Sequence, residues 1–427
     1  MRQTIITKHR TRSSAAGKTG TAGTTLACLL AFARAAEAQQ VLAPPPEVPV
    51  VPPGQQQFQT NQIGYIPAAE LTPPAKPLLQ WGPVDLRPHA DYRLSYGNGI
   101  QSTPGHRLDS VVNEISPGLL FDIGRHWSLD YTPTWRFYSN RQLQDTLDHN
   151  VRLAGWTAYE DWVLGLSQGY ATSSAPLVET GTQTFQEIYS TALTASYLFN
   201  SKVSADLAVN QNFVSVQDFS NYREWSTMDW LNYQLWPRLN IAFGAGFGYV
   251  NLSAGTDMSY EDYQGRVSWR VTDKVSFQAS AGLEDRQFLS GGMPDLINPI
   301  FGLSLVYQPV QVTTFTLAAS RSVSASYFEN LVTENTGVNV GLTQRLFKKV
   351  YLGLTGGYAR ASYVGTAGSA VFAGRVDDYY SFGATLSTVF LKRGSIALFY
   401  QYTDNSSSQV GYAFSSDQVG LELGYKF

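Results

Sequence analysis

The sequence closes on the stretch Val419-Gly420-Leu421-Glu422-Leu423-Gly424-Tyr425-Lys426-Phe427. Apolar side chains occupy every second position of this stretch, and small or charged residues occupy the positions between them. Because successive side chains of a strand point to opposite faces, this period of two predicts a β-strand with one apolar and one polar face. Terminal residues are usually polar and frayed, so a strand that ends on an aromatic residue is unusual for a soluble domain.

Short turns recur upstream of this stretch. They are Gly124-Arg125-His126, Glu160-Asp161, Asn200-Ser201-Lys202, Pro237-Arg238, Thr272-Asp273-Lys274, Gln308-Pro309-Val310, Lys348-Lys349 and Lys392-Arg393-Gly394. Consecutive turns lie roughly 35 to 45 residues apart, which suits two membrane-spanning strands of about 9–11 residues with one long and one short loop. Looser segments rich in Ser, Gly, Asn, Asp and Thr lie between the turns, for example Tyr96 to Arg107 and Ser173 to Thr184.

Short and long connections would therefore alternate, as they do in barrels with short turns at one membrane face and long loops at the other. A large soluble β-sandwich or β-helix would have a similar composition, but it has no reason to sort connections by length. Units of two strands each predict an all-β fold, a transmembrane antiparallel up-and-down β-barrel of about 18 strands. The alternative is about 16 strands, because the first hairpin is the least distinct.

The composition agrees with a sheet that has one apolar and one wet face. Only 15% of the residues are charged, 13% are aromatic, and the mean hydropathy is −0.16. No apolar run of about 18 residues follows the N-terminus, so transmembrane helices are not expected. Between residues 127 and 137 Trp, Leu, Tyr, Pro and Phe alternate with Ser, Asp, Thr and Arg. We expect the apolar face of such strands to contact lipid and the polar face to line the lumen.

The N-terminus predicts export. A basic region precedes the short apolar core Leu26 to Phe32, and Ala36-Glu37-Ala38 supplies small residues for cleavage, so residues 1–38 are predicted to be a signal peptide. Half of the 20 prolines fall between Gln39 and Gln80, which indicates an extended, unpaired segment. We predict a Pro-rich periplasmic spacer at 39–84 and the barrel at 85–427.

Aromatic residues cluster beside the short turns. Amphipathic rings favour the headgroup level of a membrane, so we expect these residues to form an interfacial girdle. Ordinary strand propensity is the alternative explanation, because strands also favour aromatic residues. The predicted girdle residues are Trp127, Trp162, Phe199, Trp236, Trp269, Tyr307, Phe347 and Phe390.

Charged residues on the polar faces of the strands are the candidate functional residues. The alternation predicts that the following charges line the lumen: Glu114, Asp130, Arg136, Asp148, Arg152, Asp206, Arg266, Arg270, Glu284, Arg286, Arg345, Glu422 and Lys426. Opposed acidic and basic groups create a transverse field that favours hydrated solutes. Alternatively, the charges only pair across strands and stabilise the wall.

The closing stretch resembles the C-terminal sorting signal of bacterial outer-membrane β-barrels. The resemblance is carried by Val419, Leu421, Leu423, Tyr425 and Phe427. It implies localisation in the bacterial outer membrane as an integral β-barrel. Contact with outer-membrane lipid is then expected, and so are barrel-assembly machinery and periplasmic chaperones as partners during insertion. We also expect the closing strand to pair with a first strand near Asp91 to Tyr96.

A second resemblance lies in the first part of the barrel. Ser116-Pro117, Tyr131-Thr132-Pro133, Tyr138-Ser139-Asn140 and Asp148-His149 resemble the family of outer-membrane proteins known as "Putative beta-barrel porin 2". The specific letters cover residues 110–170, whereas the layout covers most of the barrel. The resemblance implies an outer-membrane barrel of porin type, and some members of that family are linked to exopolysaccharide export.

Catalytic, metal and cofactor chemistry is not expected. After the signal peptide the four histidines are scattered, at His89, His106, His126 and His149, and no metal cluster or Ser–His pair is apparent. The chain carries a net charge of −3, and the predicted signal peptide is basic, so the remainder is still more acidic and nucleic acid is not an expected partner.

The leading hypothesis is therefore a porin-like channel for passive diffusion of small hydrophilic solutes. One alternative is an outer-membrane conduit or accessory in exopolysaccharide export, which predicts a plugged or aromatic-lined bore. Another is a structural surface barrel without transport, which predicts loops folded over the lumen. The sequence leaves the solute, the bore and the oligomeric state open.

Overall fold

The computed structural model describes residues 77–290, 294–365, 372–391 and 393–427. The predicted signal peptide lies outside these residues, and so does most of the predicted spacer. Both remain predictions. No helix among the described residues is long and apolar enough to span a membrane.

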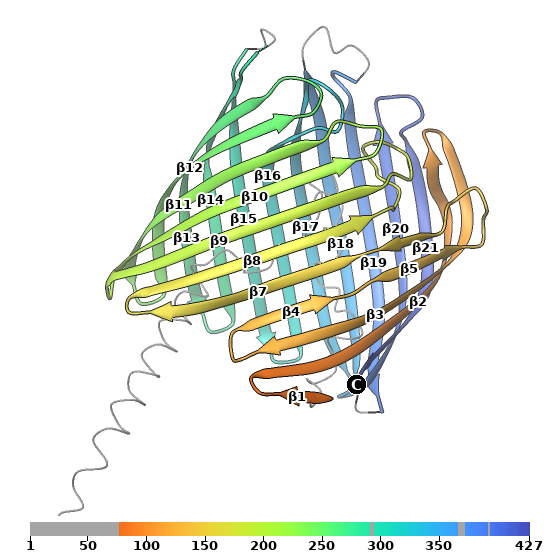
Figure 1. Ribbon diagram of the computed structural model, residues 1–427, viewed down its shortest axis with the longest axis horizontal. Coiled ribbons are helices and arrows are strands. Elements are labelled where there is room, and N and C mark those ends of the chain that lie inside the picture. The colour runs from red at the N-terminus through yellow and green to blue at the C-terminus, as the bar shows by residue number, and fades with distance from the viewer. Residues whose placement is uncertain (1–76, 291–293, 366–371, 392) are drawn as a thin grey trace, which may run out of the picture. The chain divides into compact units, whose positions relative to one another are not determined.

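The described residues form one antiparallel sheet that closes on itself (Figure 1). Its strands are β1 (Leu79–Trp81), β2 (Val84–Thr103), β3 (His106–Ile123), β4 (Trp127–Tyr131), β5 (Thr134–Tyr138), β6 (Thr146–Asp148), β7 (Asn150–Tyr159), β8 (Trp162–Ser173), β9 (Gln186–Asn200), β10 (Val203–Val216), β11 (Tyr222–Trp236), β12 (Leu239–Leu252), β13 (Met258–Thr272), β14 (Val275–Phe288), β15 (Leu296–Val310), β16 (Thr313–Ala325), β17 (Leu331–Leu346), β18 (Val350–Gly365), β19 (Val376–Phe390), β20 (Gly394–Ser407) and β21 (Phe414–Lys426).

The closed wall contains 18 strands in the described part of the chain, which confirms the predicted strand number. β4 and β5 both pair with β3 and together make one wall strand, and β6 and β7 continue one another in the same way. β1 pairs only with the start of β2, and it lies within the range predicted as spacer. Pro133 separates β4 from β5, because proline has no N–H to donate to the ladder.

The barrel closes where β2 pairs with β21. The register places Asp91 opposite Gly424 and Tyr96 opposite Val419, so the predicted pairing of the closing strand is confirmed. This ladder removes the two edges that an open sheet would present to lipid. An unpaired N–H or C=O costs several kcal/mol in hydrocarbon, so closure is a condition for spanning a membrane.

The predicted short turns gather at one end of the barrel, which we call the turn end, and the longer connections gather at the other, the loop end. Two boundaries differ from prediction. The predicted loop from Tyr96 to Arg107 is wrong, because β2 continues to Thr103 and β3 begins at His106. Two register shifts and the positive φ of Gly99 (75°) keep this Gly-rich segment paired. In addition, β15 extends through Pro309 to Val310 before it turns.

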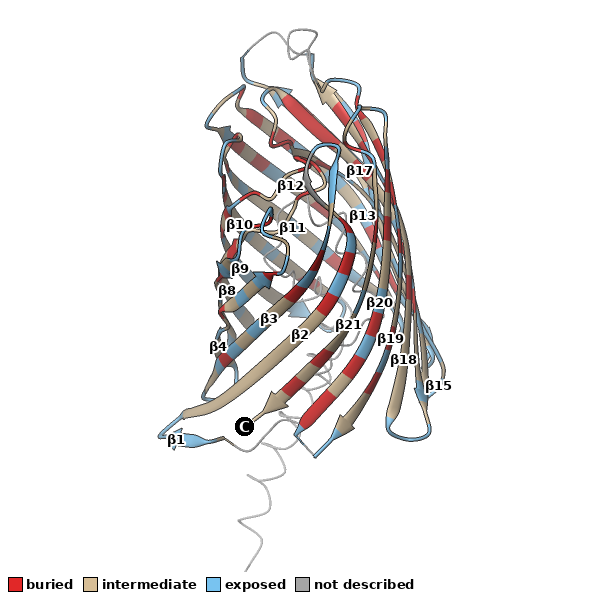
Figure 2. Cartoon of the chain, turned by 90° about the vertical axis from the view of Figure 1, so that its right-hand side faces the viewer, coloured by how far each residue is buried: buried red, intermediate tan, exposed pale blue. Residues whose placement is uncertain are grey.

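Burial alternates along the strands, as the bands in Figure 2 show. Leu231 and Phe243 are 56% and 62% exposed, whereas Arg266 and Glu284 are each 4% exposed. Neighbours in register share a face, so the exposed apolar side chains lie on the convex outer surface and the polar ones on the concave inner surface. This is the face assignment that the sequence predicts.

The closing seam offers a direct test of this assignment. Leu421 lies on the outer face at the middle of β21, opposite Leu94 and Leu398. We expect Leu421→Arg to lower the free energy of unfolding in phospholipid vesicles by about 2–4 kcal/mol, because its charge faces hydrocarbon. Gln418→Arg on the inner face of the same strand is the control. Denaturant titration followed by tryptophan fluorescence measures both, and equal losses would contradict the assignment.

Candidate functional site

The inner face of the barrel carries the candidate charges. Strand register places every predicted lumen charge on the side of the wall that faces inward, namely Glu114, Asp130, Arg136, Asp148, Arg152, Asp206, Arg266, Arg270, Glu284, Arg286, Arg345, Glu422 and Lys426. Arg270 and Arg345 lie near the turn end and are exposed. The others are at least partly buried against neighbouring strands.

The buried charges pair with one another. Arg136 lies between two carboxylates, 2.7 Å from Glu114 and 2.9 Å from Asp148. A second pair joins Arg286 to Glu284 at 2.7 Å. Removing one partner of such a buried pair leaves an uncompensated charge and costs about 3–5 kcal/mol.

A third group surrounds Arg266. Its guanidinium lies 3.6 Å from the Asp206 carboxylate, donates a hydrogen bond of 2.9 Å to Asn232, and covers the ring of Trp230 at 4.1 Å. Asp130 accepts a hydrogen bond of 2.7 Å from Thr132 and lies opposite Arg152 in register. These contacts support the interpretation that the inner charges stabilise the wall across strands.

Sequence reasoning missed inward charges on β2. Arg93 lies opposite Glu114 on one side and Glu422 on the other, and its guanidinium covers the Phe399 ring at 4.3 Å. Asp91 faces inward on the same strand. The strand alternation that would reveal them is present, but it covers only the short interval between the predicted spacer, which ends at residue 84, and the predicted loop, which begins at residue 96.

The predicted girdle residues lie on the outer surface beside the turns. The most exposed is Phe347, at 90%, in a turn where it adopts a positive φ of 44°. The other exposed girdle residues are 39–61% exposed, and Trp127 and Trp162 are half-buried. The exposed members are Phe199, Trp236, Trp269, Tyr307 and Phe390.

Loops at the other end of the barrel fold against the inner wall. We call segments 174–185, 326–330 and 372–375 the plug. Leu177 and Tyr327 of the plug are each 2% exposed, and they pack in one apolar cluster with inward-facing Val250 and Met258. The β8–β9 loop and the β16–β17 loop therefore occupy space inside the barrel rather than outside its rim.

The ends of β16 and β17 bend inward to reach this cluster. The ladder between β15 and β16 reaches only as far as the pair Phe301 and Arg321, so β16 separates from β15 beyond that point. Beyond the separation Val323 joins the inner cluster, and its carbonyl accepts a hydrogen bond of 3.3 Å from Arg286 on β14. Arg286 of the wall thus also holds the inward bend of β16, which leads into the plug.

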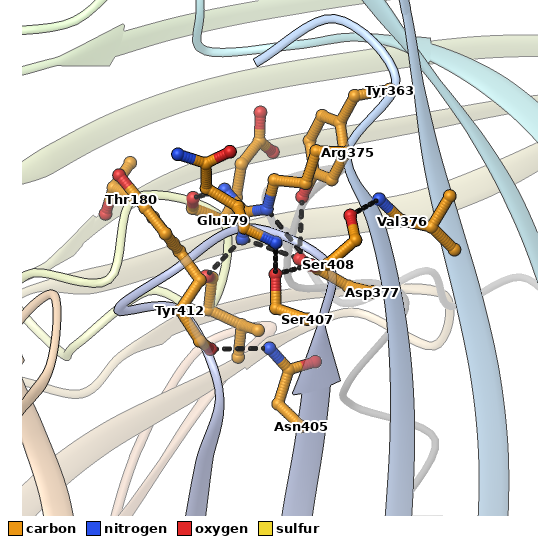
Figure 3. A network of polar contacts seen from close by, with 12 residues as sticks. Glu179, Thr180, Tyr363, Arg375, Val376, Asp377, Asn405, Ser407, Ser408 and Tyr412 are labelled. Atoms are coloured by element: carbon orange, nitrogen blue, oxygen red, sulfur yellow. Dashed lines mark hydrogen bonds and ion pairs between the residues drawn. The ribbon is translucent and has the colours of Figure 1, made fainter. Parts of the chain in front are cut away.

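Two charged residues join the loops of the plug (Figure 3). The carboxylate of Glu179 accepts hydrogen bonds from the Ser326 hydroxyl (2.6 Å) and the Tyr327 backbone N–H (2.9 Å). The guanidinium of Arg375 donates to the Glu179 carbonyl at 2.8 Å and pairs with Asp377 through two of its nitrogens, at 2.5 and 3.0 Å. Both side chains are buried.

The β20–β21 connection completes this network. Ser407 donates a hydrogen bond of 2.5 Å to the Asp377 carboxylate, and the Tyr412 ring lies under the Arg375 guanidinium at 3.9 Å. A row of rings continues across the mouth from Tyr412, through Phe372 (5.6 Å) and Phe328 (4.1 Å further on), to Phe219 (5.7 Å). Five connections are therefore tied together at the loop end.

The described residues offer little to catalysis. Among them, no group of three or more His, Cys, Asp or Glu side chains is placed to hold a metal ion. His149 faces outward, with its Nδ1 atom 3.1 Å from the Tyr131 hydroxyl. A catalytic pair would need a nucleophile and a base aligned on a substrate.

Comparison with known families identifies the C-terminal part of the chain. Residues 257–427 match the family described as "Putative beta-barrel porin 2". This is the family that the sequence resembled, although the match lies downstream of the motifs within residues 110–170. No curated protein matches the chain.

Comparison with solved structures finds several that are similar to this chain. The protein opdK from Pseudomonas aeruginosa is 14% identical, with 80% of this chain and 98% of that chain covered and a TM-score of 0.44. OccK11 (OpdR) from the same organism is 13% identical, covering 80% and 96%, with a TM-score of 0.41. The siderophore receptor PirA of P. aeruginosa is 10% identical, covering 80% of each chain, with a TM-score of 0.42.

Arg375 is predicted to hold the plug in place. Arg375→Ala removes the hydrogen bonds to the 174–185 loop and leaves Asp377 without its bidentate partner, so we expect this loop to exchange its amide hydrogens much faster. Arg360→Ala is the matched control, because Arg360 pairs with Asp378 on the outer face of the same strands. Hydrogen exchange followed by mass spectrometry compares the two, and equal protection of the loop in both variants would contradict the role of Arg375.

The plug is also predicted to loosen as pH rises. Burial raises the pKa of the Glu179 carboxyl above its ordinary value of 4.5. The folded plug therefore holds this proton more tightly than the opened loop does, and its stability falls as pH rises from 4.5 through the raised pKa. After correction for the intrinsic rise of amide exchange with pH, protection of the 174–185 loop should fall over that interval in the wild type and stay constant in Glu179→Gln. A pH response that is unchanged in Glu179→Gln would refute this assignment.

Proposed function

We propose that this protein is a porin-like channel of the bacterial outer membrane, through which small hydrophilic solutes diffuse passively. A closed barrel with an apolar outer face and a polar inner face is suited to a lipid bilayer, since all of its wall strands pair with neighbours. Barrels of this strand number leave an aqueous bore unless something fills it. The family match over residues 257–427 supports the same class.

One observation carries the proposal. Ser304, Ser320 and Ser322 point into the barrel and are exposed. Hydroxyl groups that are exposed on the inner face contact water inside the barrel. Passive diffusion requires a wet passage, and these exposed hydroxyl groups would line part of it.

The plug favours the alternative of a structural barrel without transport, because it places loops across part of the lumen. Its row of aromatic rings also agrees with an aromatic-lined bore, which an exopolysaccharide conduit or accessory would have. The rings contact one another, however, with centroids 4.1 to 5.7 Å apart, so much of their surface is used to hold the loops together. We therefore assign the plug the role of narrowing the channel.

Single-channel recordings distinguish a diffusion channel from a structural barrel without transport. We expect the purified protein to give stable single-channel currents in planar bilayers, and we expect Arg375→Ala to give larger currents because its plug is released. Arg360→Ala should conduct as the wild type does. The absence of current at any voltage, in the wild type and in Arg375→Ala alike, would overturn the channel proposal and favour the structural barrel.

The proposed function implies a route by which the protein reaches the outer membrane. An integral outer-membrane barrel would be delivered by the signal peptide at 1–38 and inserted by barrel-assembly machinery with periplasmic chaperones. Residues 39–84 would then form a spacer on the periplasmic side. The prediction that the chain is not an enzyme follows from the same proposal, since a diffusion channel has no reacting group.

A further inference from the structure

The inner wall of the barrel is divided into a charged part and an uncharged part. Apart from Arg345, the inward charges described above lie on β2–β7, β10, β13, β14 and β21. From β15 to β20, the described inward-facing residues carry a charge only at the two ends, at Arg345 near the turns and at Asp377 beneath the plug. The remaining charges of these strands, such as Glu334, Arg360 and Asp378, face outward.

Small polar residues take the place of charges on the uncharged part. Its inward positions alternate Gly and Ala with hydroxyl and amide side chains, among them Ser304, Thr316, Ser320, Asn339, Thr355 and Thr385. These side chains can each donate or accept hydrogen bonds and carry no net charge. Ser304 and Ser320 are exposed inside the barrel, whereas Asn339, Thr355 and Thr385 are 4%, 7% and 8% exposed.

The charged part is filled instead. Arg266, Glu284 and Arg286 are 4%, 4% and 1% exposed. Arg266 packs on the Trp230 ring, and Arg286 packs on the Tyr260 ring and pairs with Glu284. By contrast, Ser304 and Ser320 are exposed. The exposed hydroxyl groups of the uncharged wall therefore lie on β15 and β16, where they contact water inside the barrel.

We infer that solutes pass along the inner face of β15 and β16, and that this path selects neutral, polyhydroxylated solutes such as sugars and sugar alcohols. The inference rests on the channel function proposed above. Wall hydroxyl and amide groups replace the water that a sugar hydroxyl loses, whereas an ion loses hydration without a charge to replace it. The opposite wall offers less compensation, because most of its charges are at least partly buried and several of them pair with one another.

Proteoliposome swelling tests the selectivity. The probes are glucose, gluconate and glucosamine, which have nearly the same size and differ in charge. We expect glucose to enter several times faster than either charged analogue. Faster entry of gluconate or glucosamine than of glucose would overturn the inference, whereas failure of all three solutes to enter would instead count against the channel function itself.

Two matched variants test the path. Ser320→Asp places a carboxylate on the uncharged wall, and Thr194→Asp places one at a similar height on inward-facing, exposed Thr194 of β9. We expect Ser320→Asp to slow gluconate entry about fivefold, the factor that corresponds to ~1 kcal/mol between like charges 4 Å apart in water, and Thr194→Asp to change it much less. Far-UV circular dichroism confirms that both variants fold. Equal effects of the two, or a larger effect of Thr194→Asp, would overturn the path.

Discussion

Backbone pairing is the constraint on which this structure depends. In contact with hydrocarbon, every peptide group of the wall needs a partner inside the sheet, so the first long strand and the closing strand have to meet. The ladder from His89 to Asn98 on β2 supplies that meeting, against Lys426 to Asp417 on β21. Once the wall is closed, alternation along each strand fixes which side chains face lipid and which face inward. The inner charges and the plug are arranged within limits that this closure sets.

Side-chain contacts within the wall also position the connections at the loop end. Arg286 pairs with Glu284 and also donates to the carbonyl of Val323, so a wall charge positions the inward bend of β16. That bend carries Ser326 and Tyr327 to Glu179 on a loop 147 and 148 residues earlier in the chain. The plug is therefore an extension of the wall's hydrogen-bond network, and its position depends on the wall beneath it.

Features that depend on the alternation of residues along a strand could be predicted from the sequence. Features that depend on contacts between residues far apart in the chain could not. Alternation and turn spacing predicted the barrel, its strand number, the seam and the face of each charge. They did not predict the partners of the charges, because register brings Arg136 beside Glu114 and Asp148 only after three strands have paired. The plug left no local signal, since a polar loop such as 174–185 looks the same whether it folds inward or outward. In the Gly-rich first hairpin, bulges interrupt the alternation of apolar and polar residues, so the sequence predicts a loop where the two strands continue.

The contacts of the inner wall also affect how the barrel responds to the changes in salinity that a protein at a cell surface meets. Mobile ions screen charges over about 8 Å at physiological ionic strength and over shorter distances in brine. The pair of Arg286 and Glu284 is held at 2.7 Å with side chains only 2% and 6% exposed, so dissolved salt has little access to it. We therefore expect this contact to depend less on ionic strength than a pair of exposed charges would.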